Sequence, residues 1–514
     1  MNVDRRSFLK KAGIAAAGLS LMNCNITRRQ KKPNIIYILA DDLGYGELGC
    51  YGQEKIETPN IDKLAKNGMK FTQHYSGSPV SAPSRCVLMT GKHAGHAYIR
   101  GNDGMSSRGD IWDYEKMANN PKLEGQRPIP DETKTIPELL KTSGYKTGAI
   151  GKWGLGPPHS EGSPNNQGFD FFYGYICQRI AHSYYPTHLW KNGKKDTLRN
   201  ELVVPHQKLG KDKDPNDPES YEKFHGKDYA PTLMYDEMEN FVERNKNQPF
   251  FFYWASIIPH VALAAPDKWV DYYRKKFGEE EPYTGDSGYL PNQYPNATYA
   301  AMISYLDENV GKLVKKLKDL GIYDDTLIIF TSDNGPTYTG GADTVWFDSA
   351  DPFKSEYGYS KGFVHEGGIR VPMIAQWPGK IKPGSQSDHI SAFYDVMPTM
   401  CDLGKAECEV ETDGISFAKT LLGKKGQKEH KYLYWEFPAY GGQQAVRMGK
   451  WKAIRKDIKK GNMKIELYNL EKDLRELNNV AAQHPEIVAE IEKIMEKEHQ
   501  TSRVQTFRMK ALDS

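Results

Sequence analysis

Two pairs of polar residues, each directly after an apolar run, could bind a metal ion. Asp41 and Asp42 follow one run, and Asp333 and Asn334 follow another. Adjacent carboxylates repel each other unless a cation or strong hydrogen-bond donors lie between them. An Asp-Asp pair alone also occurs at helix caps, and Asn334 alone could simply begin a turn. Together the four side chains offer only hard oxygen ligands, which favours Ca²⁺ or Mg²⁺ over zinc.

A hydroxyl and a cation lie close together in the segment 81–92. It begins Ser81-Ala-Pro-Ser-Arg85 and continues into an apolar-Thr-Gly-Lys stretch. A proline-fixed turn there could place Ser81 at the N-terminus of a helix. The helix dipole and Arg85 would both stabilise an anion at that position. The same residue types also occur at ordinary helix starts, so the segment alone leaves a nucleophile and a plain helix start open.

Apolar runs of strand length alternate with helical segments and would position these residues. Short runs that are apolar on both faces predict buried parallel strands. Their alternation with helices favours an α/β fold, a mostly parallel central sheet sandwiched by helices. Ligands bind beyond the carboxyl ends of such strands, where both polar pairs and Lys152 would emerge. The predicted strands are 34–40, 147–151, 250–257 and 326–331, and the predicted helices are 59–67, 135–144 and 299–320.

Long polar stretches rich in proline and glycine interrupt this pattern. They are too long for simple connections, so we expect loops that build the rim of a pocket. The stretches are 101–131, 156–230 and 335–362.

The pattern of apolar and polar residues changes after about residue 385. Short aromatic segments at 432–436 and 450–454 predict antiparallel strands, and a final helix begins at Pro485. We therefore predict a catalytic α/β domain over 33–384 and a smaller C-terminal α+β subdomain over 385–514.

Composition and the N-terminus bear on partners and location. The 514 residues include 69 Lys and Arg against 66 Asp and Glu, a net charge of +3, which argues against a nucleic-acid binder. Residues 1–24 resemble a twin-arginine export signal, with Arg5-Arg6 before an apolar run too short to span a bilayer. Cys24 is either a lipidation site or part of a cleavage region. We expect an exported protein, periplasmic or lipid-anchored, without a transmembrane segment in the mature chain.

The segment 81–92 resembles the motif of the type I, formylglycine-dependent sulfatases, which begins with Cys or Ser followed by x-Pro-Ser-Arg. The resemblance extends from residue 33 to about 500 and identifies a serine-type, arylsulfatase-like member of the alkaline-phosphatase-like superfamily. Further motifs occur in the family's order. These are Asp41-Asp42, Gly151-Lys152-Trp153, Pro259-His260, Ser332-Asp333-Asn334-Gly335, Lys361 with Glu366–Pro372, and Glu466–Leu470.

The resemblance implies a role for each of these residues. Ser81 would be converted to formylglycine by a maturation enzyme, and its hydrate offers one hydroxyl to attack sulfur and a second to expel sulfate. Arg85 and Lys152 would orient that hydrate, while His260 and Lys361 would bind sulfate or handle the leaving oxygen. One calcium ion would be held by Asp41, Asp42, Asp333 and Asn334, and would also contact residue 81.

The sequence departs from the family at Gly154, where a histidine usually follows the lysine by two residues. His182 is a candidate replacement, although it could equally be a structural histidine that bonds to backbone. The surrounding insert is rich in Tyr, His and Lys, which suits a sugar ring, so Arg179, His182 and Tyr184 are predicted substrate-binding residues. The other interpretation of the insert is a solvated loop.

The sequence therefore predicts an exported, calcium-dependent sulfatase that acts on a sulfated saccharide, with galactose or N-acetylgalactosamine sulfates favoured. Two alternatives remain at this point. One is a metal-dependent phosphoesterase or phosphonate hydrolase that uses an unmodified Ser81. The other is an inactive sulfated-glycan binding protein, for which Gly154 is the only support.

Overall fold

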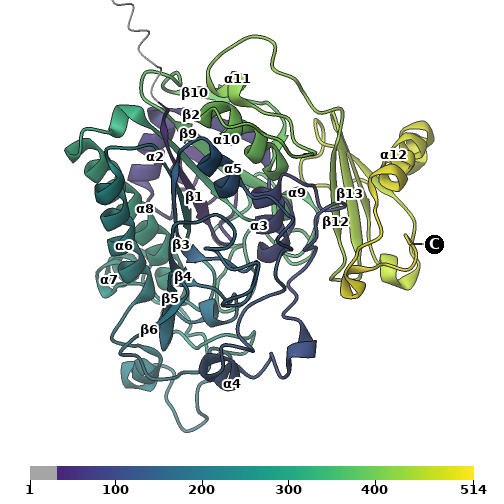
Figure 1. Ribbon diagram of the computed structural model, residues 1–514. Coiled ribbons are helices and arrows are strands. Elements are labelled where there is room, and N and C mark those ends of the chain that lie inside the picture. The colour runs from purple at the N-terminus through teal and green to yellow at the C-terminus, as the bar shows by residue number, and fades with distance from the viewer. Residues whose placement is uncertain (1–31, 514) are drawn as a thin grey trace, which may run out of the picture. The chain divides into compact units, whose positions relative to one another are not determined.

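The computed structural model describes residues 32–513 of the chain (Figure 1). The predicted export signal at 1–24, with Cys24, lies outside the described residues. From Pro33 onward the elements belong to one compact unit. Among residues 32–513, no helix is long and apolar enough to cross a membrane.

Four parallel strands form the centre of the main sheet. β1 (Asn34–Ala40) pairs with β8 (Thr326–Ser332) on one side and with β7 (Phe250–Ala255) on the other. β3 (Lys146–Lys152) follows β7, also in parallel. Every residue of β1, β7 and β8 is buried, as expected for strands covered on both faces. The prediction of a mostly parallel α/β sheet is confirmed.

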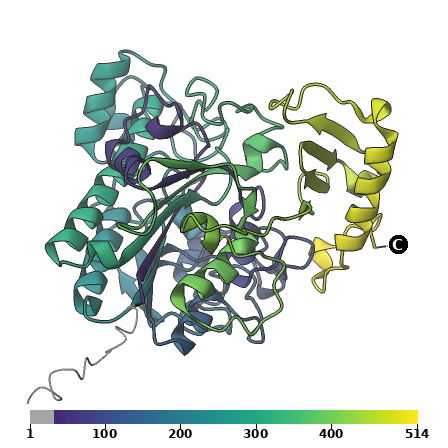
Figure 2. The same cartoon turned by 90° about the horizontal axis from the view of Figure 1, so that it is seen from above.

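Helices cover both faces of this sheet, and the pleat of β1 explains why both faces are apolar (Figures 1 and 2). Ile35, Tyr37 and Leu39 belong to one hydrophobic core, whereas the residues between them, such as Ile36 and Ile38, belong to the other. The first core is covered by α3 (Ser81–Thr90), α5 (Ile136–Thr142) and α10 (Val396–Gly404), and the second by α2 (Pro59–Lys66), α6 (Ala230–Asn245), α7 (Asp267–Phe277) and α8 (Pro295–Asp319).

Both outer parts of the sheet contain strands that the sequence analysis does not predict. These strands carry polar residues, so they do not stand out as apolar runs. β9 (Arg370–Gln376) runs antiparallel to β8 and to β2 (Met69–Tyr75). Short edge strands β10 (Ser385–Ser387) and β11 (Ser391–Ala392) pair with β2.

The prediction that 156–230 consists of loops is wrong in part. Three strands in this stretch extend the sheet beyond β3, namely β4 (Phe171–Tyr175), β5 (His188–Lys191) and β6 (Lys194–Thr197). These strands are short, and the Lys-Lys-Asp-Thr sequence of β6 is exposed. No long apolar run in the sequence therefore marks them. Likewise the stretch 101–131 contains the short helix α4 (Tyr114–Asn119).

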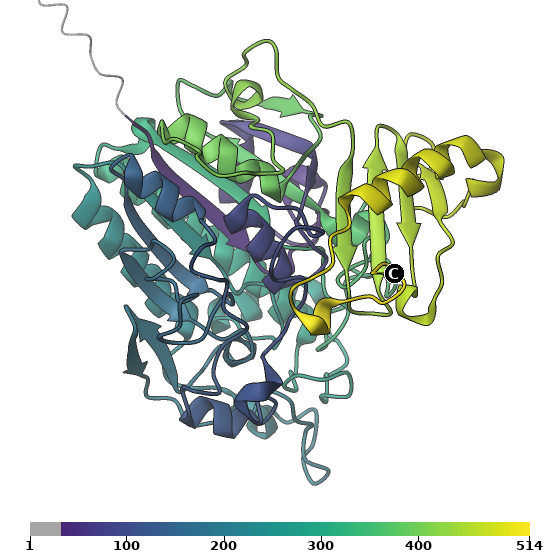
Figure 3. The same cartoon turned by 45° about the vertical axis from the view of Figure 1, so that its right-hand side comes forward.

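The C-terminal part is a four-stranded antiparallel sheet with a helix packed on one face (Figure 3). Val446 and Leu467 of this sheet pack against Ile491 of the helix, whereas Trp435 and Ile454 join the first core of the main sheet. The elements are β12 (Leu433–Phe437), β13 (Gln443–Met448), β14 (Trp451–Arg455), β15 (Glu466–Asn469) and α12 (Pro485–Glu498). The predicted antiparallel strands and final helix are confirmed.

A buried ionic network joins the two sheets. Glu366, in the short helix α9 (Glu366–Ile369), is fully buried and pairs with Lys452 of β14 at 2.8 Å and with Arg370 at 3.1 Å. The Tyr75 hydroxyl also donates to it, at 2.7 Å. Burial by itself would raise the pKa of Glu366, but Lys452, followed by Arg447 and Arg370, holds that pKa well below the usual value.

Replacing Glu366 with alanine is expected to lower the free energy of unfolding by about 3–5 kcal/mol, because Lys452 would remain buried without this carboxylate. Urea unfolding measures this loss. Because the pKa of Glu366 is held down, its contribution is present above about pH 4.3 and is lost as the pH falls toward the folded-state pKa. Glu492→Ala is the control, since its carboxylate pairs with Arg455 but is 47% exposed. A solvent-screened pair should cost about 1 kcal/mol or less. Equal losses in the two variants would contradict the network's role.

Candidate active site

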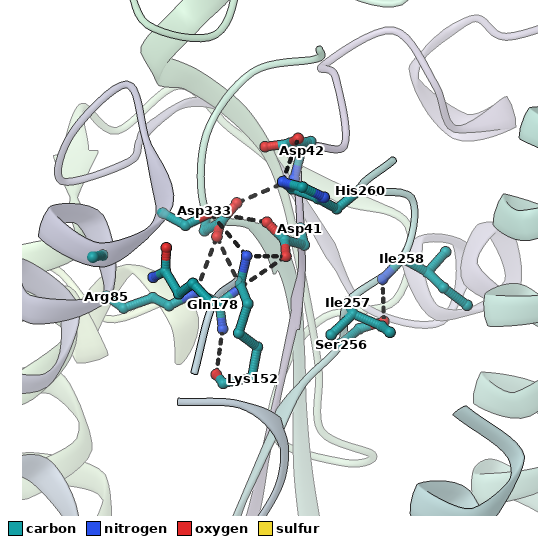
Figure 4. Close-up of polar contacts among 12 residues, drawn as sticks. Asp41, Asp42, Arg85, Lys152, Gln178, Ser256, Ile257, Ile258, His260 and Asp333 are labelled. Atoms are coloured by element: carbon teal, nitrogen blue, oxygen red, sulfur yellow. Dashed lines mark hydrogen bonds and ion pairs between the residues drawn. The ribbon is translucent and has the colours of Figure 1, made fainter. Parts of the chain in front are cut away.

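The carboxyl ends of β1 and β8 bring four polar residues together. Asp41 and Asp42 follow β1, Asp333 and Asn334 follow β8, and all four are fully buried. Figure 4 shows Asp41, Asp42 and Asp333 close together. The Asp42 backbone N–H donates to Asp333 Oδ1 at 3.1 Å, and Asn334 Nδ2 donates to Asp42 Oδ1 at 2.8 Å. Asp42 has a φ of 64°, in the left-handed region that aspartate tolerates better than most residues. The two pairs predicted to converge therefore lie in one cluster.

Ser81 is the first residue of α3 and lies against this cluster. Its hydroxyl donates to Asp41 Oδ1 at 2.9 Å and accepts from Lys152 Nζ at 3.2 Å. The side chain is 2% exposed. The helix therefore directs its positive N-terminal end, together with a hydroxyl, at the carboxylates.

Two cations bond to the carboxylates next to Ser81, one from the same helix and one from β3. Arg85, one turn along α3, donates through Nε and Nη2 to Asp333 Oδ2 at 3.0 and 2.8 Å. Its Nη1 donates to the Lys152 carbonyl at 2.8 Å. Lys152 ends β3, and its Nζ also contacts Asp41. Asp333 is thus bonded to Arg85, and Asp41 contacts Lys152.

A second pair of basic side chains faces Asp42. Lys361 Nζ donates to Asp42 Oδ2 at 2.6 Å, and His260 Nε2 lies 3.7 Å from the same oxygen. The other ring nitrogen of His260 contacts the carbonyl of Val261. Lys361 and His260 therefore reach the cluster at Asp42, whereas Arg85 contacts Asp333 and Lys152 contacts Asp41.

Burial and neighbouring charges shift the pKa values of the cluster. Burial would raise the pKa of Asp41, but Lys152, followed by His260 and Arg85, holds it well below its usual value. Burial, reinforced by the charge of Asp41, raises the pKa of Asp333 to about 6. Burial and the adjacent Lys361 lower the pKa of His260 to about 4, so its ring is neutral at neutral pH. Such opposed shifts in one cluster are typical of functional sites.

The donor set fits a hard divalent cation. Asn334 Oδ1 is buried and takes part in no hydrogen bond, whereas Asp41 Oδ2 contacts the Lys152 ammonium group. Buried polar atoms without hydrogen bonds are rare and often mark an ion site. Asp41 and Asp42 each offer an oxygen within 4.8 Å of the other and of a His260 nitrogen. An all-oxygen set of three carboxylates and one amide matches the ligands that Ca²⁺ prefers.

The three predicted substrate-binding residues lie in different surroundings. The His182 ring stacks on the His260 ring with centroids 5.1 Å apart. Tyr184 is buried, and its hydroxyl donates to the carbonyls of Ile257 and His260, so it supports the loop that carries His260. The Arg179 guanidinium stacks 3.2 Å from the centre of the Trp112 ring, which is itself 76% exposed.

The structure adds residues that the sequence analysis did not single out. His206 Nε2 lies 2.9 Å from His182 Nδ1, and Tyr289 packs against the rings of His182, His206 and His260. Tyr289 lies outside the insert, and neither residue belongs to a periodic pattern. Only the abundance of histidine and tyrosine in the insert pointed toward this cluster.

Comparisons with known proteins agree with this geometry. A family profile named Sulfatase matches residues 33–406, and one for the C-terminal part of N-sulphoglucosamine sulphohydrolase matches 355–505. An N-acetylgalactosamine-6-O-sulfatase of Bacteroides thetaiotaomicron is 30% identical over 91% of this chain and 94% of its own length. Human arylsulfatase A is 31% identical over 82% and 75%. A crystal structure of Ps i-CgsB in complex with k-i-k-neocarrahexaose is similar at a TM-score of 0.70 and 30% identity, over 91% and 94%.

Proposed function

The chain belongs to the sulfatase family, and we propose that it is an exported, calcium-dependent sulfatase that removes sulfate from a sulfated saccharide. The observation that carries this proposal is the position of Ser81. Its hydroxyl lies at a helix N-terminus between a carboxylate and an ammonium group, beside an all-oxygen donor set. A nucleophile held there lies beside cations that can bind an anionic ester and stabilise its negative charge.

Two groups would complete this site. Asp41, Asp42, Asp333 and Asn334 would hold calcium, which supplies a Lewis acid for a sulfate oxygen. Ser81, oxidised by a maturation enzyme, would supply the hydrated aldehyde of formylglycine as the nucleophile.

The side chains around Ser81 orient and stabilise charge. Arg85 is fixed between Asp333 and the Lys152 carbonyl, so it holds the end of β3 against α3. The Lys152 ammonium group lies beside the oxygen of residue 81 and stabilises negative charge that develops there. Preorganised donors of this kind contribute the largest single share of rate enhancement in many enzymes.

His260 and Lys361 would handle the sulfate group and the leaving oxygen. Lys361 offers a positive charge beside Asp42. The neutral ring of His260 gains a proton more readily once an anionic sulfate binds, because a nearby negative charge raises the pKa of a histidine. In that form Nε2 can donate its proton to the leaving oxygen.

A saccharide is the substrate class that the surroundings favour. The half-exposed ring of Tyr440, in the loop between β12 and β13, lies beside Gly362, next to Lys361. The aromatic rings of His206 and Tyr289 pack together, and Tyr289 also packs against His260. Aromatic faces with nearby donors suit sugar rings. The relative named N-acetylgalactosamine-6-O-sulfatase and the Ps i-CgsB complex with k-i-k-neocarrahexaose agree, and we favour galactose or N-acetylgalactosamine sulfates.

The test is release of inorganic sulfate and phosphate by protein purified from its native host, so that residue 81 is matured. The panel consists of galactose and N-acetylgalactosamine sulfates, with the corresponding phosphates. We expect sulfate release from at least one of the sugar sulfates and no comparable phosphate release. Phosphate release alone would contradict the proposal and favour a phosphoesterase, and binding without turnover would indicate a glycan-binding protein.

Removing divalent cations should abolish activity. Chelation is expected to lower kcat by at least about 10²- to 10³-fold, the cost of losing one preformed source of charge stabilisation. Calcium should restore activity, and calcium at 100 times its Kd should stabilise the fold by about 2.7 kcal/mol. Metal analysis, activity and thermal unfolding measure these effects together. Full activity in protein shown to be metal-free would contradict the calcium assignment.

A further inference from the structure

Gln178 has a buried carboxamide whose nitrogen makes no hydrogen bond. The residue is 6% exposed, and its Nε2 has no hydrogen-bond partner. Leaving a buried donor unpaired costs about 1–3 kcal/mol. A native structure that bears this cost calls for an explanation, and a missing ligand is one.

The carboxamide occupies the space that a side chain at position 154 would fill. Gly154 has no side chain, and a Cβ atom built there would lie 2.5 Å from Gln178 Nε2 and 2.8 Å from Gln178 Cγ. Gly154 comes two residues after Lys152, whose Nζ lies 3.2 Å from Ser81 Oγ. Gln178 appears with Lys152 and Arg85 in the close-up of the site (Figure 4).

The backbone around Gln178 is fixed. Its N–H donates to Gln126 Oε1 at 2.8 Å, and the Gly154 N–H donates to the Ile176 carbonyl at 3.2 Å. The chain segments on both sides of the carboxamide are therefore held in place. Rotation about the last side-chain bond of glutamine has broad, shallow minima, so the nitrogen can turn toward an incoming oxygen at little cost.

We propose that Gln178 is a substrate-binding residue whose Nε2 donates a hydrogen bond to an oxygen of the sulfate group bound at Ser81. This inference rests on the proposed function. Three cations, Arg85, Lys152 and Lys361, already surround the site. A carboxamide adds a donor without adding charge, and it does not titrate. An imidazole at this place would face those same cations, which lower the pKa of a neighbouring histidine.

The test uses inorganic sulfate and the unmatured Ser81 form of the full-length protein, with calcium present. Gln178→Met keeps the length of the side chain and removes the donor. Titration calorimetry should show sulfate affinity weakened by about 10- to 100-fold, as expected for a hydrogen bond to a charged group. The factor should be the same at pH 6 and pH 8, because the donor is neutral. In the matured enzyme kcat/KM should fall by a similar factor.

Gln167→Met is the matched control. Gln167 is 1% exposed, lies in the same insert, and donates through Nε2 to the Glu161 carbonyl. Its replacement should cost stability and leave the Kd for sulfate unchanged.

Gly154→Ala tests the position without changing Gln178. A methyl group 2.5 Å from Nε2 must displace the carboxamide, so sulfate affinity should again fall. Because Gly154 has a φ of 77°, this variant also carries backbone strain, which thermal unfolding measures separately. The double variant should bind sulfate no more weakly than Gln178→Met, since the displaced group is already absent.

Wild-type affinity in Gln178→Met, or additive losses in the double variant, would overturn the assignment of Gln178. Failure of the proposed function gives a different result, in which the wild-type protein itself neither binds sulfate nor releases it.

Discussion

Replacing Ser81 with alanine is expected to lower kcat on a sulfated saccharide by about 10⁴- to 10⁶-fold, the range seen when an enzyme loses its nucleophile. The variant keeps the four side chains proposed to hold calcium, Asp41, Asp42, Asp333 and Asn334, and the surrounding cations, so it should still bind sulfate. The loss should therefore appear in kcat much more than in KM. Rates of sulfate release with enzyme from the native host, under saturating substrate, measure it.

Ser84→Ala is the control for this experiment. Ser84 lies one turn further along α3, is fully buried, and accepts a hydrogen bond from the Gly77 N–H at 3.1 Å. Its replacement should cost about 1 kcal/mol of stability and leave kcat within a few-fold of the wild type. Undiminished sulfate release by Ser81→Ala would refute the assigned nucleophile.

Replacing His260 with glutamine should lower kcat most for substrates with poor leaving groups. If Nε2 protonates the leaving oxygen, kcat on a saccharide sulfate should fall by about 10²- to 10⁴-fold, the usual contribution of a general acid. A nitrophenyl sulfate should lose far less, because nitrophenolate leaves without a proton. Comparing the two substrates with the same variant therefore separates proton transfer from sulfate binding.

A second buried histidine serves as the control for His260. His188 is 1% exposed and pairs with Glu124 at 3.1 Å, within the strand β5. His188→Gln should lower stability and change the two substrates' kcat values in the same proportion. Equal losses on both substrates in His260→Gln would contradict the proton-donor role and leave only sulfate binding.

The central strands were predictable because strands that are buried on both faces consist almost entirely of apolar residues. β1, β7 and β8 are continuous apolar runs, and parallel strands place their carboxyl ends at one edge, so Asp41 and Asp333 had to converge. The outer strands carry no such pattern. β2 alternates polar and apolar residues, and β6 is nearly all polar, so their pairing depends on the sheet already being present.

Residues in the irregular segments were harder to predict for a related reason. Tyr184 has an aromatic ring, which suggests sugar binding, but its hydroxyl is bonded to two backbone carbonyls. Gln178 belongs to no motif, and only the missing side chain at Gly154 makes its carboxamide significant. Such convergence is set by tertiary contacts between loops, which no local pattern records.

The mass of the tryptic peptide Phe71–Arg85, from protein made in the native host, tests the central claim most directly. Oxidation of Ser81 to formylglycine removes two hydrogens, about 2 Da, and adds an aldehyde that reacts with hydrazides. We predict that the shifted peptide accounts for the sulfatase activity, with the two quantities rising together across preparations. A fully active preparation in which residue 81 is unmodified serine would contradict the account.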